Sequence, residues 1–258
     1  MAKVLSLQVK ISTRQTMMMK QVKPMKAGIS DDGQAHILRR FDEDMRKLQK
    51  RVLKMGRLVR DQMVNLQGAY SGDDEDAAEQ VIEGDRSVDA LEVKVDKFIV
   101  RLLARRSPVG GDLRYIVTAS RIVTDLERLG DETVQMARVL ETEYGNLGQC
   151  KGRAIEDEVR ELLLLLIELF DQAMQAFRDY DYRAAKELAT GKTGPDGELQ
   201  QRIQELTSCT LVQKDDVSHA VNLVLILRSM ERGMRYVQNI GEHIIYLATG
   251  KDVRHKGV

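Results

Sequence analysis

Residues 124–132 read TDLERLGDE, and residues 229–243 read SMERGMRYVQNIGEH. Each stretch places Glu-Arg among apolar residues spaced three or four positions apart, which is the period of an α-helix. Glu231 of the second stretch follows Glu127 of the first by 104 positions. The two stretches therefore look like one helix that occurs twice in the chain.

A second pair of segments repeats at almost the same distance. AYSGDDEDAAEQVIEGD begins at Ala69, and AFRDYDYRAAKELATGK begins 107 positions later at Ala176. Two matches at nearly one offset predict a duplicated three-helix unit. The composition agrees, because 43% hydrophobic and 31% charged residues with only 3 Pro favour long amphipathic helices. We therefore predict an all-α fold.

The spacing of the apolar residues predicts six long helices. The expected helices cover about residues 34–69, 75–104, 112–143, 154–178, 183–212 and 216–249, with a break in the fifth at GKTGPDG. The three glycines of YGNLGQCKGR mark the boundary between the two halves. The expected parts are a flexible basic leader over 1–35, a first three-helix bundle over 36–146, a second over 152–250 and a tail over 251–258.

Charge and missing motifs exclude several classes of protein. Forty basic residues balance forty acidic ones, so the whole chain has no electrostatic attraction for nucleic acid. Cys150 and Cys209 lack the spacing of a zinc site or a disulfide framework, which predicts reduced thiols in a cytoplasmic protein. The longest apolar run, residues 162–167, is far below the ~20 residues that span a bilayer. No P-loop and no Glu-x-x-His spacing occur, so we predict no catalytic residue.

Acidic residues form a stripe on the second predicted helix. The stripe consists of Asp85, Asp89, Glu92 and Asp96. Their spacing places them on one side of the helix, away from the apolar side. The third helix adds Glu127 and Asp131, again four residues apart. Carboxylates on two neighbouring helices suit Mg²⁺, Mn²⁺, Ca²⁺ or iron. The alternative is a solvated face interleaved with Arg86, Lys94 and Lys97.

Three motifs resemble, in order, those of the PhoU family of bacterial phosphate-uptake regulators. They are VIEGDRSVDALE from residue 81, ARRSPVGGDLRYIVTASRIVTDLERLGDE from residue 104 and RSMERGMRYVQNIGEHIIYLATGKDVRH from residue 228. The similarity extends from about Phe41 to His255. It implies two tandem, pseudo-symmetric three-helix bundles, a homodimer and multinuclear metal sites on the bundle surface.

The resemblance also implies a set of ligands. Carried over residue by residue, the first-half metal site consists of Asp85, Asp89, Glu127 and Asp131 and holds a divalent metal or iron. The alternative is that these acids form salt bridges with neighbours such as Arg121 and Arg128.

The second half departs from the pattern of the family. Arg235 stands where the first half has Asp131, and Lys192 stands where it has Asp85, while Asp196 matches Asp89. Because neither Arg nor protonated Lys has a lone pair for a metal, we predict a salt-bridge cluster around Glu231 in place of a second metal site.

The functional hypothesis follows from the resemblance. It is a cytoplasmic, non-catalytic negative regulator of phosphate uptake and of the phosphate-starvation regulon. Such a protein acts as an adaptor between the ATPase subunit of a phosphate ABC transporter and a sensor histidine kinase, without nucleic acid binding or membrane insertion. One alternative is a metal-dependent helical-bundle enzyme that uses the same four acids. Another is a diverged paralogue that serves a different transporter or kinase.

Overall fold

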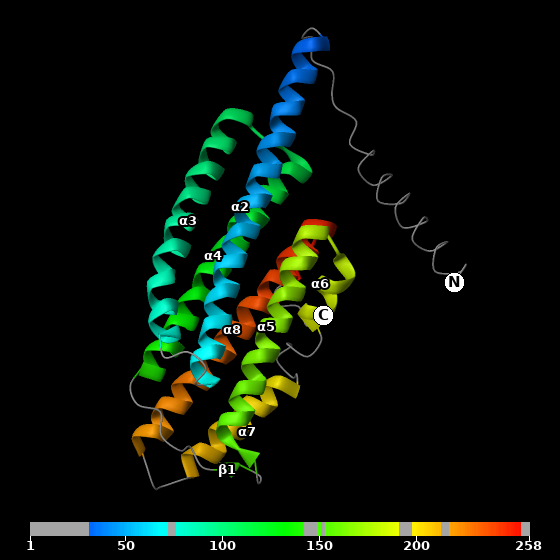
Figure 1. Cartoon of the computed structure of the whole chain (residues 1–258). Coiled ribbons are helices and arrows are strands. Elements are labelled where there is room, and N and C mark those ends of the chain that lie inside the picture. Colours follow the sequence, from blue (N-terminus) through cyan, green and yellow to red (C-terminus); the bar gives the residue numbers. More distant parts are fainter. Residues whose placement is uncertain are drawn as a thin grey trace, which may run out of the picture. The chain divides into compact units, whose positions relative to one another are not determined.

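The computed structural model describes residues 31–71, 76–141, 149–150, 153–190, 198–212 and 217–253. The chain divides into two compact units, residues 1–42 and residues 43–258, and the contacts below lie within the second. Helices make up nearly all of the described residues (Figure 1). The prediction of an all-α fold is confirmed.

Seven helices occur in the described part of the chain. They are α2 (Asp31–Ser71), α3 (Ala77–Arg106), α4 (Gly110–Glu141), α5 (Ile155–Asp179), α6 (Tyr182–Thr190), α7 (Glu198–Val212) and α8 (Val217–Thr249). The fifth predicted helix is thus divided into α6 and α7, and its predicted break, residues 191–197, lies outside the described residues. None of these helices is long and apolar enough to cross a bilayer.

A short antiparallel pair, β1 (Gln149–Cys150) and β2 (Arg153–Ala154), lies in the glycine-rich segment between the halves. Strands of two residues carry no periodic signal, so the sequence did not predict them. The predicted leader overlaps α2, which begins at Asp31, whereas residues 1–30 and 254–258 lie outside the described residues. The predicted bundle boundaries stay a prediction.

The helices bury the stripes that their apolar spacing predicts. In α2 the buried residues include Leu48, Val52, Met55, Val59 and Met63. In α3 they include Val81, Val88, Leu91, Val95, Ile99 and Leu102. Burial of such side chains contributes about 1.5–3 kcal/mol each to the free energy of folding. The opposite sides of α2 and α3 face solvent and carry their charges.

The turn between α3 and α4 follows from its sequence. Ser107 adopts a left-handed conformation with φ 44°, and its N–H donates to the Leu103 carbonyl at 3.2 Å, which ends α3. Pro108 follows, and Gly110 has φ 59°, a value that glycine adopts without steric cost. α4 therefore reverses direction and packs along α3.

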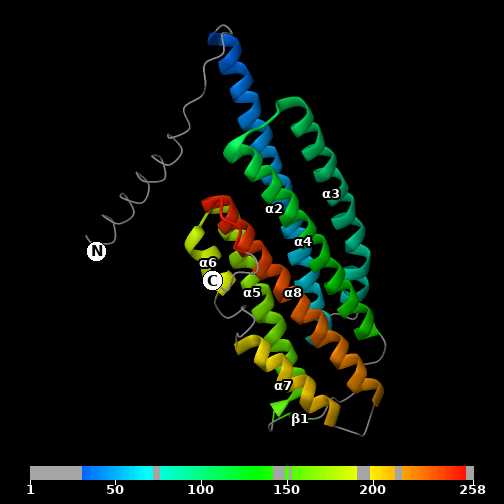
Figure 2. The ribbon, with the colours of Figure 1, turned by 180° about the vertical axis from the view of Figure 1, so that it is seen from behind.

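α4 lies between α3 and α8 and connects the two halves of the chain (Figure 2). Contacts run from Glu132 with Arg232 at one end to Arg114 with the Leu247 carbonyl at the other. Because residue numbers rise along α4 as they fall along α8, the two helices are antiparallel. Gly233 permits a close approach, since a Cβ at that position would lie 3.0 Å from Leu129 Cδ1.

Candidate functional site

Carboxylates of α3 and α4 gather in the first half of the chain. α3 carries Asp85, Asp89 and Glu92, and α4 carries Glu127 and Asp131. Neighbours on each helix are three or four residues apart, so their side chains share a helix face. These five residues are called the acidic cluster below. It contains all four ligands that the sequence predicted.

Glu127 shows that the two helices bring these acids together. Burial raises the pKa of Glu127 from 4.5 to about 7, and repulsion from Asp131, Glu92 and Asp89 adds to the rise. Two of these three carboxylates belong to α3, so they act across the interface between α3 and α4. Near neutral pH the Glu127 carboxyl is therefore partly protonated.

Repulsion between carboxylates also raises the pKa values of other members of the acidic cluster. Burial raises the pKa values of Asp85, Asp131 and Glu92, and neighbouring carboxylates add to each rise. For Asp131, Asp85 and Asp89 act from across the helix interface. Arg138 opposes the rise for both Asp85 and Asp131 but does not cancel it. The acidic cluster thus retains an excess of negative charge that a bound cation would relieve.

A buried amide lies beside the cluster. Gln62 is 4% exposed, and its Nε2 donates to Asp85 Oδ1 at 3.3 Å and to the Val81 carbonyl at 3.4 Å. Its Oε1 is buried and accepts no hydrogen bond within the described part of the chain. Gly130 leaves room for this arrangement, because a Cβ there would lie 3.2 Å from Gln62 Oε1 and 3.7 Å from Asp85 Oδ1.

The acidic cluster has the residue types that bind a hard cation, but its side chains are not positioned to hold one. Carboxylate oxygens and an unused amide oxygen are the donors that such ions prefer. However, no three His, Cys, Asp or Glu side chains among the described residues are grouped so that they could hold a metal ion. A metal would therefore require the carboxylates to turn toward one another, which relief of their repulsion would favour.

Sequence reasoning missed two parts of this site. Glu92 belongs to the predicted stripe but not to the predicted ligand set, although it lies three residues after Asp89 on the same helix. Gln62 comes from α2, which carries no motif, so nothing in the sequence identified it. Only the packing of α2 against α3 brings its amide to Asp85.

The second half of the chain differs from the first at the positions that correspond to the acidic cluster, as its sequence suggests. Glu231, the counterpart of Glu127, forms an ion pair with Arg228 at 2.7 Å. Arg235, the counterpart of Asp131, is exposed on the same helix. Lys192 and Asp196 lie outside the described residues. The predicted absence of a second metal site stays a prediction.

A buried polar group joins α4 to α8. Asp125 and His243 are 4% and 6% exposed, and His243 Nε2 lies 2.9 Å from Asp125 Oδ2. Asn239 Nδ2 donates to the other oxygen, Asp125 Oδ1, at 3.2 Å. No sequence pattern predicts this contact, because its partners lie more than a hundred positions apart.

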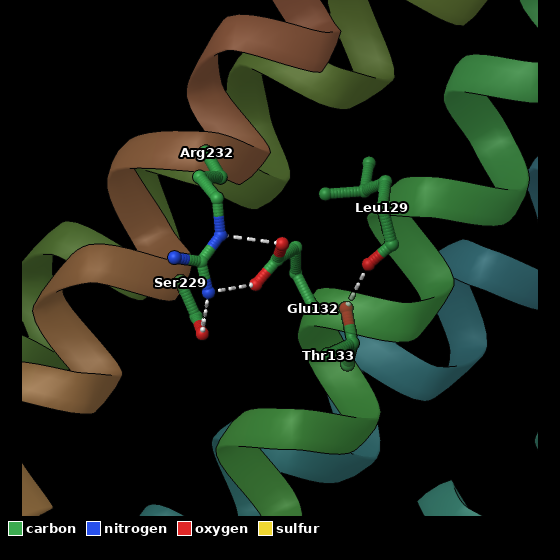
Figure 3. Close-up of polar contacts among 5 residues, drawn as sticks. All are labelled: Leu129, Glu132, Thr133, Ser229 and Arg232. Carbon is green, nitrogen blue, oxygen red and sulfur yellow. Dashed lines mark hydrogen bonds and ion pairs between the residues drawn. The ribbon is translucent and has the colours of Figure 1, made fainter.

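A second polar contact lies further along the same interface (Figure 3). Both oxygens of Glu132 accept from the guanidinium of Arg232, at 2.5 Å from Nε and 2.7 Å from Nη2. Arg232 Nη2 also donates to Ser229 Oγ at 3.1 Å. The Arg of the second Glu-Arg pair therefore connects the halves, while its neighbour Glu231 pairs with Arg228 within α8.

Comparison with known proteins gives one consistent result. Residues 52–140 match the family model described as the PhoU domain. The chain is 33% identical over 227 residues to a Pseudomonas putida protein named phosphate-specific transport system accessory protein PhoU homolog, and the match covers 86% of each chain. It is 28% identical over 222 residues to the Escherichia coli protein named phosphate-specific transport system accessory protein PhoU, covering 86% of this chain and 90% of that one.

Solved structures agree with the sequence matches. The crystal structure of PhoU from Pseudomonas aeruginosa aligns with a TM-score of 0.72 and 31% identity, over 82% of this chain and 100% of that one. The PhoU structure from Streptococcus pneumoniae also aligns with a TM-score of 0.72, at 23% identity, which supports the fold alone.

Proposed function

Because the chain belongs to the PhoU family, we propose that it is an accessory protein of a phosphate-specific transport system. The observation that carries the proposal is the extent of the similarity to relatives that bear this name. It covers 86% of the chain at 33% identity, and therefore includes parts of both halves.

The finer proposal is a cytoplasmic negative regulator that represses the phosphate-starvation genes when phosphate is plentiful. It would connect the ATPase subunit of the transporter to a sensor histidine kinase, as a homodimer and without catalysis. The position of the acidic cluster supports a binding role, because Asp89 and Asp131 are exposed on the helix surfaces. Exposed carboxylates favour contact with a partner or an ion over chemistry in a water-free pocket.

We also propose that Asp85, Asp89, Glu127 and Asp131 hold a divalent metal or iron. The raised pKa of Glu127, which burial and three neighbouring carboxylates cause, supports this ligand set. A bound cation would supply positive charge to this surface. Gln62 would orient Asp85 through its hydrogen bond and offer a further oxygen. The carboxylates would have to turn toward one another on binding.

Deletion of the gene in its own host tests the regulatory role. We expect alkaline phosphatase activity to rise in phosphate-rich medium and to return to its low level when the intact gene is restored. A matched strain that carries Glu187→Gln, a substitution at an exposed position of α6, should behave like the parent. Unchanged phosphatase in the deletion strain would contradict the proposal and favour a paralogue that serves another transporter or kinase.

A further inference from the structure

The charges of this chain are strongly segregated, although their sum is zero. Residues 46–57 of α2, RKLQKRVLKMGR, contain six cations and no acid. Residues 97–106 of α3, KFIVRLLARR, contain four cations and no acid. The acidic cluster begins further toward the N-terminal end of α3. The α2–α3 pair therefore has a basic region over these two runs, which acidic residues 42–44 of α2 and Asp96 of α3 adjoin, and a separate acidic cluster nearer the N-terminal end of α3.

The packing of α2 on α3 brings the two basic runs side by side (Figure 1). Arg51 Nη1 donates to the Lys94 carbonyl at 3.2 Å, and the Arg51 guanidinium carbon lies 4.3 Å from the centre of the Phe98 ring. Arg106 Nη2 donates to Asp44 at 3.2 Å. Because the helices are antiparallel, residues 46–57 lie beside residues 94–106.

Nine exposed cations share this region, which is called the basic face below. They are Arg46, Lys47, Lys50, Lys54 and Arg57 on α2, and Lys94, Lys97, Arg101 and Arg105 on α3. Asp44 is held by Arg106 and lies 3.6 Å from Lys47. Among the ion pairs between described residues, this contact of Lys47 is the only one that involves the basic face. The exposed carboxylate of Asp96 lies in the same stretch of α3 and offsets one of these charges, but most of the positive charge of the basic face has no ion-pair partner in the described part of the chain and faces solvent.

Apolar groups accompany the cations. Val100 is 65% exposed and Val93 is 48% exposed on α3. A hollow of about 100 Å³ is lined by Asp44, Phe98, Arg101, Leu102, Arg105 and Arg106. This volume has room for a single side chain or acyl segment rather than for a partner helix.

We propose that the basic face binds the surface of anionic phospholipid membranes. Its cations are spread over two neighbouring helices, so that each can reach a separate headgroup, and long Lys and Arg side chains extend toward a lipid surface. Exposed Val100 would add a shallow apolar contact at the headgroup level. The inference goes beyond the proposed function, because it concerns lipid and holds whichever protein partners the chain has.

Vesicle sedimentation of the full chain tests the proposal. The probes are phosphatidylcholine vesicles with and without about one third phosphatidylglycerol, at about 0.1 M salt. We expect binding only to the vesicles that contain phosphatidylglycerol, and weaker binding as salt increases. Equal binding to both kinds of vesicle, or none to either, would overturn the proposal.

Two variants of equal charge locate the binding surface. Each cation near an anionic membrane raises the partition constant roughly fivefold. The variant Lys50→Gln, Lys54→Gln, Lys97→Gln, Arg105→Gln should therefore bind at least about tenfold more weakly, even with screening. The control variant Arg183→Gln, Lys186→Gln, Arg235→Gln, Lys251→Gln changes exposed cations elsewhere and should bind like the parent.

Circular dichroism before sedimentation shows whether both variants are folded. An equal loss of vesicle binding in the two variants would indicate an effect of net charge alone. Unchanged vesicle binding by the basic-face variant would place the binding surface elsewhere on the chain. Either result would overturn the proposal. A short DNA duplex and a polyglutamate peptide serve as rival anions at matched charge concentration. Tighter binding of either rival through the same four residues would also overturn the lipid assignment.

Discussion

His243 of α8 lies 2.9 Å from Asp125 of α4 through its Nε2 atom, and both side chains are buried. Asn239 donates to the other carboxylate oxygen of Asp125. This contact lies at the interface that joins the two halves of the chain. A buried carboxylate without its donors is costly, so these residues make the packing of α4 on α8 specific.

Removal of either partner should therefore destabilise the protein. We expect Asp125→Ala and His243→Ala each to lower the free energy of unfolding by about 3 kcal/mol, because each leaves a buried polar group without its partner. The double variant should show a coupling energy of about 1–3 kcal/mol. Urea unfolding measures all three. Glu187→Ala, at an exposed position of α6, is the control and should change stability by less than about 0.5 kcal/mol.

The raised pKa of Glu127 predicts a pH dependence. An acid whose pKa is higher in the folded state contributes stability while it is protonated, and loses that contribution as pH rises between the unfolded and folded values. For Glu127 these are 4.5 and about 7. Metal-free protein should therefore lose stability over this range, by about 1 kcal/mol once solvent screening of this half-buried group is allowed for.

Glu127→Gln should flatten that dependence, since the amide stays neutral throughout. The measurement is the urea midpoint between pH 4.5 and 7, with chelator present. Glu187→Gln is the matched control, because its carboxylate is exposed on α6 and outside the acidic cluster. The same slope in Glu127→Gln and the parent would show that this carboxyl does not carry the effect.

The sequence predicted those features that depend on a single helix or on a repeated motif. The apolar period of α2 predicted that Leu48, Met55 and Met63 would be buried, and all three are. The spacing of Asp85 and Asp89 predicted a shared helix face. The repeated Glu-Arg pair predicted a duplicated unit, which stays a prediction; the two helices that carry the pair, α4 and α8, pack together.

Features that depend on which helix faces meet could not be predicted. Nothing in one sequence indicates that Gln62 of α2 lies against Asp85 of α3, or that Asp125 meets His243. Around Glu231 the sequence predicted salt bridges in place of a metal site, but it could not identify their partners. Arg232 pairs with Glu132 across the α4–α8 interface, which depends on the antiparallel packing of two distant helices.

Gly241 predicts a further effect on stability at the contact of α6 with α8. A Cβ at this position would lie 3.0 Å from the Ala185 carbonyl oxygen and 3.2 Å from Leu188 Cβ. Because a backbone carbonyl cannot turn aside as a side chain can, Gly241→Ala should lower stability by about 1–2 kcal/mol. Gly68→Ala is the control, since a Cβ there meets nothing within 4 Å, and should raise stability by up to about 1 kcal/mol. Thermal unfolding distinguishes these outcomes, and stabilisation by both substitutions would contradict the close approach of α6.

Metal binding to the acidic cluster should be visible as stabilisation. At a free metal concentration about a hundred times the dissociation constant, a site present only in the folded state adds about 2.7 kcal/mol to the free energy of unfolding. We expect Mg²⁺, Mn²⁺ or Fe²⁺ to stabilise the parent at pH 7, and Asp85→Asn with Asp131→Asn to abolish the effect. The control Glu187→Gln with Glu231→Gln removes two carboxylates outside the cluster and should respond like the parent.

Proton release distinguishes binding at Glu127 from general ionic effects. Because its pKa is about 7, a metal that binds there must displace a proton from part of the molecules. Calorimetry in two buffers of different ionisation enthalpy measures that release. It should disappear in Glu127→Gln and persist in Glu231→Gln, whose carboxylate belongs to an ion pair with Arg228. Release that is equal in the two variants would place the metal outside the acidic cluster, and stabilisation without any release would show that Glu127 is not a ligand.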